Sequence, residues 1–458
     1  MKTLFVASEA VPHAKTGGLA DVVGALPGYL NDLGVETHVL MPRYRGVKGS
    51  PETEIVVEMK GRCNVGIFRQ GNFIFVDAPM LFDRDGLYGG EKGDYSDNLE
   101  RFTLFCKAAM KHIDVNNYDI IHCHDWQSGL VPLYMKHGKK NGKSVFTIHN
   151  LGYQGKFPKS KFHLLGLEKS YFAPEGLEFY GDINFLKAGI VYSDAVTTVS
   201  ETYAREIQSP ELGFGLDGVL RSRAQDLHGI INGIDYTQWN PESDGLIYER
   251  YSDFSGKQAN KNCICRDSCL DQRRPLIGMV SRIAAQKGFD ILVCAMEEIM
   301  DMGYSMIILG YGDESYHRKL EKLENIFHSR LSVNIKFDNR LAHRIYAASD
   351  FFLMPSMYEP CGLGQLISLR YGTVPIVRRT GGLADTVSEF NQTTKSGNGF
   401  LFSEYKGQAL LSAVKRAREI YSESDLFRQL SENCMRYDFS WAESAKKYRK
   451  LYESLISP

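Results

Sequence analysis

The sequence predicts an α/β protein of two similar domains, each with a parallel sheet flanked by helices. Short apolar runs alternate with helical patterns along the 458 residues, which is typical of parallel strands joined by helices. The alternation forms two series, and a chain of this length can hold both as separate domains. A glycine-rich phrase is also nearly repeated, as Lys-Thr-Gly-Gly-Leu-Ala-Asp-Val at 15–22 and Arg-Thr-Gly-Gly-Leu-Ala-Asp-Thr at 379–386.

The first series consists of short apolar runs separated by longer segments with helical spacing. We expect its strands at 4–7, 36–41, 73–76, 120–124, 145–149, 195–199 and 229–231, with helices that include 20–33, 98–112 and 183–192.

The second series begins after Pro275, and before it the composition turns polar and irregular. We therefore expect a first domain over 1–240, an interdomain stretch over 241–274 and a second domain over 275–439. Apolar residues at helical spacing predict a last helix over 440–456. The strands of the second series are expected at 276–280, 306–309, 335–337, 351–354 and 374–377.

Composition excludes several functional classes. A net charge of −1 gives no bulk attraction to nucleic acid or to anionic membranes, and no apolar run approaches the length that crosses a bilayer. Glu9 ends the first apolar segment too early for a signal peptide, so a cytoplasmic location is expected. The nine cysteines predict reduced thiols, and the cluster at 263, 265 and 269 lacks a fourth zinc ligand, so no metal is expected.

Both copies of the glycine-rich phrase follow an apolar stretch and precede a helical pattern. A strand, a glycine loop and a helix in this order direct backbone N–H groups toward an anion. Each copy also begins with a cation, Lys15 or Arg379. The repeat therefore predicts a phosphorylated ligand shared by two similar domains.

Further loops follow strands of the second series, where ligands bind in open α/β sheets. Arg282 and Lys287 follow the strand 276–280 and could converge on a diphosphate, although two solvated cations are the ordinary alternative. The loop 359–365 is a second strand–loop–helix nest, in which Glu359 either binds hydroxyl groups or is a surface residue. The third loop, Gly310-Tyr311-Gly312, is a weak signal alone.

Two neighbouring strands of the first series end in polar residues, His122-Cys-His124-Asp125 and His149-Asn150. These types could bind a metal, but no clean ligand set is present. We favour Asp125 and His149 as polar groups lining a cleft, with His122 in the packing layer of the sheet.

A G-x-G-x-x-G pattern occurs at Gly213, Gly215 and Gly218. A dinucleotide fingerprint needs a strand before it, whereas the preceding residues are polar and include Pro210. We therefore interpret the pattern as a flexible surface or cleft loop.

Taken together, these motifs resemble those of bacterial glycogen synthases and plant starch synthases, and the resemblance covers essentially the whole chain. No single loop would suffice, but the combination is specific. Its carriers are 15–21, 124–126, 149–155, 232–235, 281–288, 355–356, 359–363 and 378–385.

The resemblance implies a GT-B fold, with two Rossmann-like domains facing each other across a deep interdomain cleft and a C-terminal helix, 440–458, that returns to the first domain. It implies retaining transfer of glucose from ADP-glucose to the non-reducing end of an α-1,4-glucan, without metal or cofactor. The implied catalytic residues are Lys15, Asp125, His149, Arg282, Lys287 and Glu359. The implied substrate-binding residues are Lys15, Gly17, Gly18, Asp21, Asn150, Gly310, Tyr311, Gly312, Phe337, Cys361, Gly362, Leu363, Gly364, Thr380, Gly381 and Gly382.

Three positions depart from the pattern of related enzymes. Ile367 stands where many glycosyltransferases carry a second glutamate, so a two-carboxylate scheme does not follow. Phe337 replaces a tyrosine that stacks on adenine, which keeps the stacking and removes the hydroxyl. Gly364 replaces a threonine near the phosphates.

Other functions stay open on the sequence. One is another GT-B enzyme with a different nucleotide sugar, such as a sucrose-forming synthase, or a glycogen phosphorylase. Another is a non-catalytic glucan-binding relative, against which Lys15, Arg282, Lys287 and Glu359 argue. A nicotinamide dehydrogenase is weakest, because the only full glycine fingerprint lacks its strand.

Overall fold

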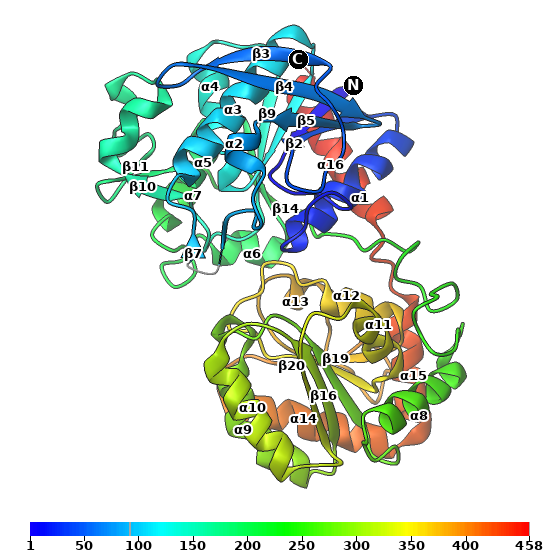
Figure 1. Cartoon of the computed structure of the whole chain (residues 1–458). Coiled ribbons are helices and arrows are strands. Elements are labelled where there is room, and N and C mark those ends of the chain that lie inside the picture. The colour runs from blue at the N-terminus through cyan, green and yellow to red at the C-terminus, as the bar shows by residue number, and fades with distance from the viewer. Residues whose placement is uncertain (91–92, 458) are drawn as a thin grey trace. The chain divides into compact units, whose positions relative to one another are not determined.

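The computed structural model describes residues 1–90 and 93–457, which divide into two compact units. One unit comprises Met1–Asn232 and the chain from Trp441 onward, and the other comprises Gly233–Ser440. Each contains a mainly parallel sheet with helices on both faces, so the predicted α/β class is confirmed (Figure 1).

The first unit is built on a nine-stranded sheet in the order β14-β13-β9-β8-β1-β2-β5-β4-β3. Its strands from β14 to β5 are parallel, and β4 and β3 add an antiparallel hairpin at one edge. The strands are β1 (Lys2–Val6), β2 (Glu36–Pro42), β3 (Thr53–Glu58), β4 (Arg62–Gln70), β5 (Phe73–Asp77), β8 (Ile120–His124), β9 (Lys143–Ile148), β13 (Ala195–Thr198) and β14 (Leu227–Gly229). Small extra sheets contain β6 (Gly89–Gly90) with β7 (Gly93–Asp94), and β10 (Lys156–Pro158), β11 (Glu178–Phe179) and β12 (Asp182–Asn184).

Helices cover both faces of this sheet, as its continuously apolar central strands require. In Figure 1, α1 and α16 lie on one side and α3, α4 and α5 on the other, in agreement with the contacts within each group. The helices are α1 (Gly18–Asp32), α2 (Pro79–Phe82), α3 (Asn98–Val115), α4 (Leu130–His137), α5 (Phe185–Tyr192), α6 (Glu201–Glu206), α7 (Asp217–Ser222) and α16 (Trp441–Ile456).

The C-terminal helix α16 belongs to the core of the first unit. Its residues Trp441, Ala445, Tyr448 and Tyr452 are buried, as their helical spacing predicts. The hydroxyl of Tyr452 lies 2.6 Å from Nδ1 of His122, which is fully buried in β8. His122 therefore lies in the packing layer, as expected.

The second unit has a six-stranded parallel sheet in the order β17-β16-β15-β18-β19-β20. Its strands are β15 (Leu276–Val280), β16 (Ser305–Gly310), β17 (Leu331–Ile335), β18 (Phe351–Met354), β19 (Val374–Arg378) and β20 (Phe400–Phe402). Its helices are α8 (Lys257–Asp267), α9 (Phe289–Asp301), α10 (Glu314–Ile326), α11 (Asn339–Ala348), α12 (Gly364–Arg370), α13 (Gly381–Thr386), α14 (Gly407–Ser422) and α15 (Ser424–Arg436).

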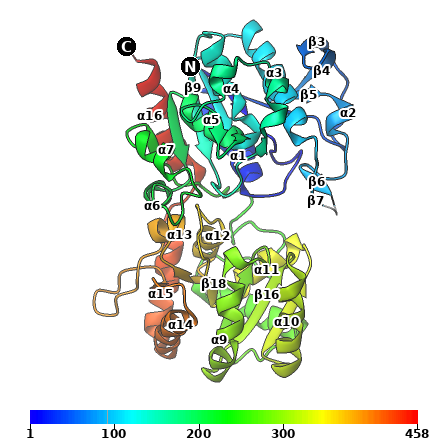
Figure 2. The ribbon, with the colours of Figure 1, turned by 90° about the vertical axis from the view of Figure 1, so that its left-hand side faces the viewer.

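Helices α9 and α10 lie on one side of the second sheet, and α8 and α11 lie on the other (Figure 1). Figure 2 shows α14 beside α15, which are joined by a short turn. Residues 241–274, expected as an irregular interdomain stretch, lie inside this unit, where α8 packs against α11. Short 3₁₀ helices complete the two units at Trp126–Ser128, Lys159–Leu165, Lys169–Tyr171, Phe254–Gly256 and Ala285–Lys287.

Most strand predictions are confirmed within a few residues, whereas the short strand β20 was not predicted and two further features differ. The strand expected at 335–337 is β17, Leu331–Ile335, so Phe337 lies beyond its carboxyl end. The hairpin β3–β4 was not predicted, because β3 buries only Val57 and resembles a polar loop. Both differences arise at sheet edges, where little apolar burial marks a strand.

Both sheets reverse their strand order beside the first strand of the unit. In the first unit, β2 lies on one side of β1 and the later strand β8 lies on the other. In the second unit, β16 and β18 flank β15 in the same way. Ligands of open α/β sheets bind at such switch points, outside the carboxyl ends of the strands.

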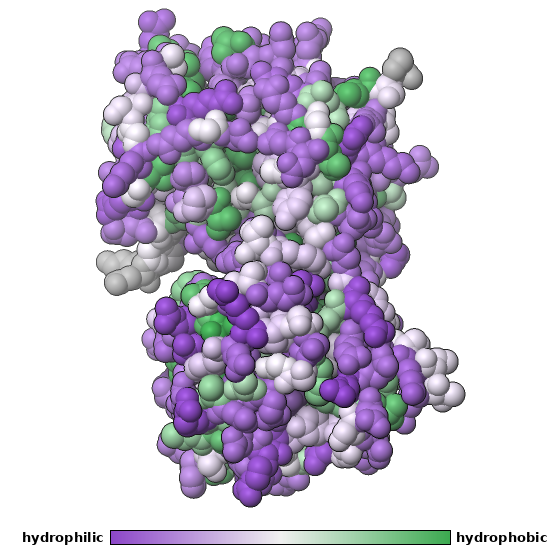
Figure 3. All heavy atoms as spheres, turned by 90° about the vertical axis from the view of Figure 1, so that its right-hand side faces the viewer, coloured by the Kyte–Doolittle hydropathy of each residue, from purple (hydrophilic) through white to green (hydrophobic). Residues whose placement is uncertain are grey.

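Among the described residues, no helix combines the length and the apolar character that a membrane span requires. On the face that Figure 3 presents, polar and charged residues cover most of the surface and apolar residues are interspersed.

Candidate functional site

The loop after β1 carries the first glycine-rich phrase at the switch point of the first unit. Nζ of Lys15 lies 2.6 Å from Oδ1 of Asp21, which is in the first turn of α1. Both side chains are partly exposed, and burial raises the pKa of Asp21 while Lys15 opposes that rise. The phrase therefore places an accessible cation just before the N-terminus of a helix. Both the cation and the helix N-terminus favour a bound anion.

The N–H groups of this loop already have an acceptor inside the protein. The carboxylate of Glu9 accepts the N–H of Thr16 at 2.5 Å, and the backbone of Gly17, the N-cap of α1, lies close enough to favour the ionised carboxylate. The contact of Gly17 with a ligand anion stays a prediction. Gly18 begins the helix itself.

Asp125 follows β8, on the other side of the switch point, with φ 55° and ψ −179°. Such a conformation is strained for a residue other than glycine. Its Oδ1 accepts the N–H of His149 at 2.8 Å, and the nearby backbone of Asn150 also favours the ionised carboxylate. Burial raises the pKa of Asp125 to about 7, and the nearby charge of Glu9 adds to the rise.

His149 and Asn150 follow β9, the neighbour of β8. Nε2 of His149 lies 3.0 Å from Nδ1 of His124, the last residue of β8. Burial lowers the pKa of His149 to about 3, so the imidazole is neutral near pH 7. The side chain of Asn150 accepts the N–H of Gly152 and forms a tight turn. These contacts fix a group of polar side chains at one sheet edge.

In the second unit, Lys287 and Glu359 meet across the switch point between β15 and β18. Nζ of Lys287 lies 2.6 Å from Oε2 of Glu359, and both side chains are largely buried. The hydroxyl of Ser356 donates to the same oxygen at 3.0 Å. Within the described chain, these side-chain contacts all reach Oε2, so Oε1 has no side-chain partner there.

Arg282 lies on the same loop as Lys287 and is exposed. Its guanidinium donates to the side chain of Gln286 at 3.3 Å, and Gln286 donates to the carbonyl of Tyr358. The backbone of Met357 also donates to the carbonyl of Gln286 at 2.8 Å. The loops after β15 and β18 are thus joined, and both carry predicted site residues.

Glycines in these loops permit close approach between backbones. A Cβ on Gly310 or Gly312 would lie about 2 Å from the carbonyl oxygen of Ser281 or Ile283. A Cβ on Gly381 or Gly382 would clash in the same way with the carbonyls of Glu359 and Cys361.

The N–H of Gly382 is donated to the carbonyls of Glu359 and Pro360, which ties α13 to the loop that carries Glu359. Thr380 is the N-cap of the short helix α13 and is buried. The segment after Glu359 leads into α12, with Leu363 as N-cap and Gly364 as first residue. Cys361 is buried and Gly362 has φ +77°. Loop packing alone therefore accounts for several glycines of the motif.

Two aromatic side chains are exposed at the carboxyl ends of neighbouring strands. Tyr311 follows β16 and is 66% exposed, and Phe337 follows β17 and is 90% exposed. The N–H of Lys336 donates to the carbonyl of Gly310 at 2.9 Å, which brings the two segments side by side. Exposed rings of this kind are suited to stacking on a planar ligand.

Three predictions about other motifs can be compared with the fold. The pattern at Gly213, Gly215 and Gly218 follows α6 and a turn rather than a strand, so its rejection as a dinucleotide fingerprint is confirmed. All nine cysteines are free. No group of potential metal ligands occurs in the part of the chain that the structure describes.

Sequence reasoning assigned no site role to Glu9, Tyr88, His124 or Ser356, although 124–126 and 355–356 are among the segments that carry the resemblance. Glu9 and His124 sit at the carboxyl ends of β1 and β8, and this position was an available signal. Tyr88 and Ser356 act through contacts that no local pattern reports.

Two family models match the chain. The starch synthase catalytic domain matches residues 2–222, and the glycosyl transferases group 1 model matches residues 264–434. The glycogen synthase of Koribacter versatilis is 45% identical over 473 residues, covering 99% of this chain and 98% of that protein.

Among solved structures, the catalytic domain of starch synthase IV from Arabidopsis thaliana, bound to ADP and acarbose, has a TM-score of 0.90 and 33% identity. The match covers 100% of this chain and 99% of that one. Sucrose-phosphate synthase from Thermosynechococcus elongatus has a TM-score of 0.65 and 20% identity, covers 99% of each chain, and shares the fold.

Proposed function

Because the chain belongs to the glycogen and starch synthase family of glycosyltransferases, we propose that it transfers glucose from ADP-glucose to the non-reducing end of an α-1,4-glucan and releases ADP. The observation that carries the proposal is the ion pair of Lys287 and Glu359 at the switch point of the second unit. The starch synthase with ADP and acarbose bound supports ADP as the nucleotide and a glucan as the acceptor. A cytoplasmic location remains a prediction.

We assign the cations to the departing diphosphate. Breaking the bond between glucose and ADP places negative charge on the leaving group, and preorganised cations stabilise it. Lys287 and Arg282 lie on one loop of the second unit, and Lys15 lies on the phrase of the first. In this assignment Asp21 holds Lys15 until the sugar donor binds.

We assign Glu359 to the transferred glucose. Its Oε2 is engaged by Lys287 and Ser356, and its other oxygen is the group that would accept hydrogen bonds from sugar hydroxyls. A carboxylate neutralised by a lysine is a weak nucleophile, so retention is assigned to same-face attack assisted by the departing phosphate rather than to a covalent intermediate.

Asp125 and His149 are assigned to the same sugar from the first unit. The neutral imidazole of His149 can donate or accept a hydrogen bond without placing a cation beside the oxocarbenium-like carbon. Asn150 is assigned to sugar hydroxyls. The backbone of Gly18, Gly310, Gly312, Gly362–Gly364 and Thr380–Gly381 is assigned to the donor phosphates and sugar.

The adenine is assigned to the exposed rings of Tyr311 and Phe337, which flank the carboxyl ends of β16 and β17. Stacking on an aromatic ring does not distinguish adenine from uracil strongly, so the base preference needs a direct measurement.

The test is a coupled assay of nucleotide release with glycogen as acceptor. The proposal predicts release of ADP from ADP-glucose, dependent on glycogen, at a kcat/KM above that for UDP-glucose. A higher kcat/KM with UDP-glucose, or no release from either nucleotide sugar, would contradict it.

A further inference from the structure

We propose that Glu9 is a positioning residue of the donor site: its carboxylate, held in turn by Tyr88, fixes the loop that carries Lys15. The inference rests on the proposed contact of Lys15 with the donor phosphates.

Glu9 is only 3% exposed, and its carboxylate accepts hydrogen bonds from the backbone of Thr16, the hydroxyl of Thr16 and the hydroxyl of Tyr88. Its Oε2 accepts the N–H of Thr16 at 2.5 Å, and both oxygens lie within 3.1 Å of the Thr16 hydroxyl. The hydroxyl of Tyr88 donates to Oε1 at 3.0 Å, and the backbone of Gly17 lies close enough to favour the ionised carboxylate. The residue that follows Lys15 in the chain is therefore tied to this carboxylate by both its backbone and its side chain.

Burying an ionised carboxylate costs free energy unless hydrogen bonds or a counter-ion compensate for the lost hydration. Burial raises the pKa of Glu9, and no lysine or arginine of the described chain lies within ion-pair distance of it. The hydrogen bonds favour the ionised form, and the start of α1 favours a negative charge. The carboxylate thus takes the place that a ligand anion would occupy at Thr16, so a phosphate bound at this loop would contact Lys15 and the backbone that follows Thr16.

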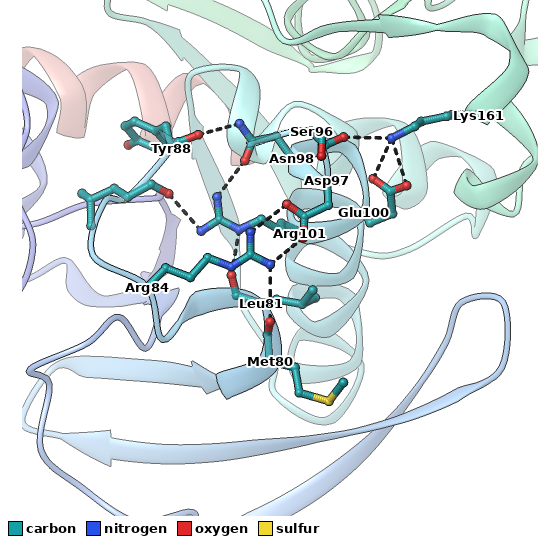
Figure 4. Close-up of polar contacts among 11 residues, drawn as sticks. Met80, Leu81, Arg84, Tyr88, Ser96, Asp97, Asn98, Glu100, Arg101 and Lys161 are labelled. Atoms are coloured by element: carbon teal, nitrogen blue, oxygen red, sulfur yellow. Dashed lines mark hydrogen bonds and ion pairs between the residues drawn. The ribbon is translucent and has the colours of Figure 1, made fainter. Parts of the chain in front are cut away.

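Tyr88 is fixed by a network that Figure 4 shows. Arg101, fully buried on α3, donates to the carbonyls of Leu81 at 2.8 Å and Leu87 at 2.9 Å, and to the side chain of Asn98 at 2.7 Å. The amide of Asn98 donates to the carbonyl of Tyr88 at 2.8 Å.

A second set of contacts holds the segment that carries Tyr88. Arg84 forms a two-pronged contact with the carboxylate of Asp97, at 2.6 Å and 2.8 Å (Figure 4). The hydroxyl of Tyr88 also lies 2.6 Å from that of Ser8, the residue before Glu9. A chain of polar contacts thus runs from α3 through Tyr88 and Glu9 to the residues beside Lys15.

Glu9→Gln is the sharpest change, because an amide group keeps the shape of the side chain but turns one acceptor into a donor. The amide nitrogen would stand where one carboxylate oxygen now accepts hydrogen bonds from Thr16 or from Tyr88, so at least one contact that holds the loop is lost. Misplacing a catalytic group by about 1 Å can cost about 100-fold, so we expect kcat/KM for ADP-glucose to fall by about 10- to 100-fold. The KM for glycogen should not change.

Tyr88→Phe removes one hydrogen bond to the same carboxylate and should lower kcat/KM for ADP-glucose by about fivefold. Tyr134→Phe is the matched control, because the buried Tyr134 hydroxyl donates to the carbonyl of Leu165 at 2.8 Å, elsewhere in the unit. This control should leave kcat/KM unchanged.

The decisive measurement is a double-mutant cycle of Glu9→Gln with Lys15→Ala, read as kcat/KM for ADP-glucose. If Glu9 acts through the Lys15 loop, Glu9→Gln has almost no further effect once Lys15 is absent. Losses that multiply in the double variant would overturn the inference, as would an unchanged kcat/KM in Glu9→Gln.

If Glu9→Gln does not fold, as judged by circular dichroism, Tyr88→Phe with Lys15→Ala decides by the same criterion. If Glu9→Gln keeps the kcat/KM of the parent protein while Lys15→Ala is inactive, only the positioning role is refuted. Full activity of Lys15→Ala refutes the proposed phosphate contact itself.

Discussion

Nζ of Lys287 and Oε2 of Glu359 lie 2.6 Å apart, although the two residues come from loops separated by 72 positions in the chain. The contact joins the loop after β15 to the loop after β18, on either side of the point where the sheet reverses its order. A cation assigned to the diphosphate and a carboxylate assigned to the sugar therefore share one ion pair.

Glu359→Ala should abolish glucose transfer while changing the affinity for ADP only modestly. The carboxylate is assigned to the sugar, and without it Lys287 keeps its full charge for the diphosphate. Turnover with ADP-glucose and ADP binding by calorimetry measure the two effects. Equal losses of turnover and ADP affinity would make Glu359 a binding residue only.

Lys15→Ala should lower turnover by about 100-fold or more, because it removes a charge that stabilises the leaving group. The side chain is 45% exposed, so the melting temperature should not change. Lys140→Ala is the matched control, since Lys140 pairs with Asp114 at 2.7 Å at similar exposure. An unchanged transfer rate in Lys15→Ala would exclude the phosphate role.

Phe337→Ala should weaken ADP binding by about 5- to 10-fold, in line with the loss of one base–aromatic stack. Tyr311→Ala should act in the same direction. Met80→Ala, which changes another highly exposed apolar residue, is the control. ADP titrations by calorimetry would test this prediction. An unaltered affinity for ADP in both aromatic variants would contradict the assignment of the adenine to these rings.

Asp125 should make stability depend on pH in a defined direction. Its folded pKa of about 7 lies above the ordinary value of 3.8, so between these values the folded state binds more protons than the unfolded state. Stability is therefore lost as pH rises through this window, by at most about 1.4 kcal/mol per pH unit. His149 acts oppositely, because its folded pKa of about 3 lies below the ordinary 6.5.

Asp125→Asn removes the first effect and leaves the second. The melting temperature of the variant relative to the parent protein should rise steadily from pH 4 to pH 7, followed by circular dichroism. A constant difference over that range would show that Asp125 has an ordinary pKa in the folded protein.

The sequence predicts the central strands well because they are buried on both faces and read as continuous apolar runs, as in β1 and β18. It predicts the site loops from their position after those strands. The hairpin β3–β4 escapes prediction because its residues are mostly exposed. The end of β17 was misplaced because the apolar residues Ile335 and Phe337 stand on either side of Lys336, an alternation that is typical of a strand.

Polar contacts between residues far apart in the chain could not be predicted from the sequence. Glu9 looks like the end of an apolar segment, and nothing local reveals that Tyr88, 79 positions later, holds its carboxylate. The glycines were predicted as anion ligands, whereas Gly381 and Gly382 also have a packing role that depends on which loop lies opposite. Pairings of this kind are set by the order of strands in the sheet.

The most direct test of the account is incorporation of labelled glucose from ADP-glucose into glycogen, followed by digestion with an exo-acting enzyme that removes α-1,4-linked units from non-reducing ends. The account predicts label in the glycogen that is released early in the digestion, with one ADP formed per glucose transferred. Label found as free glucose before the digestion, or glycogen that stays unlabelled while ADP-glucose remains intact, would contradict the account.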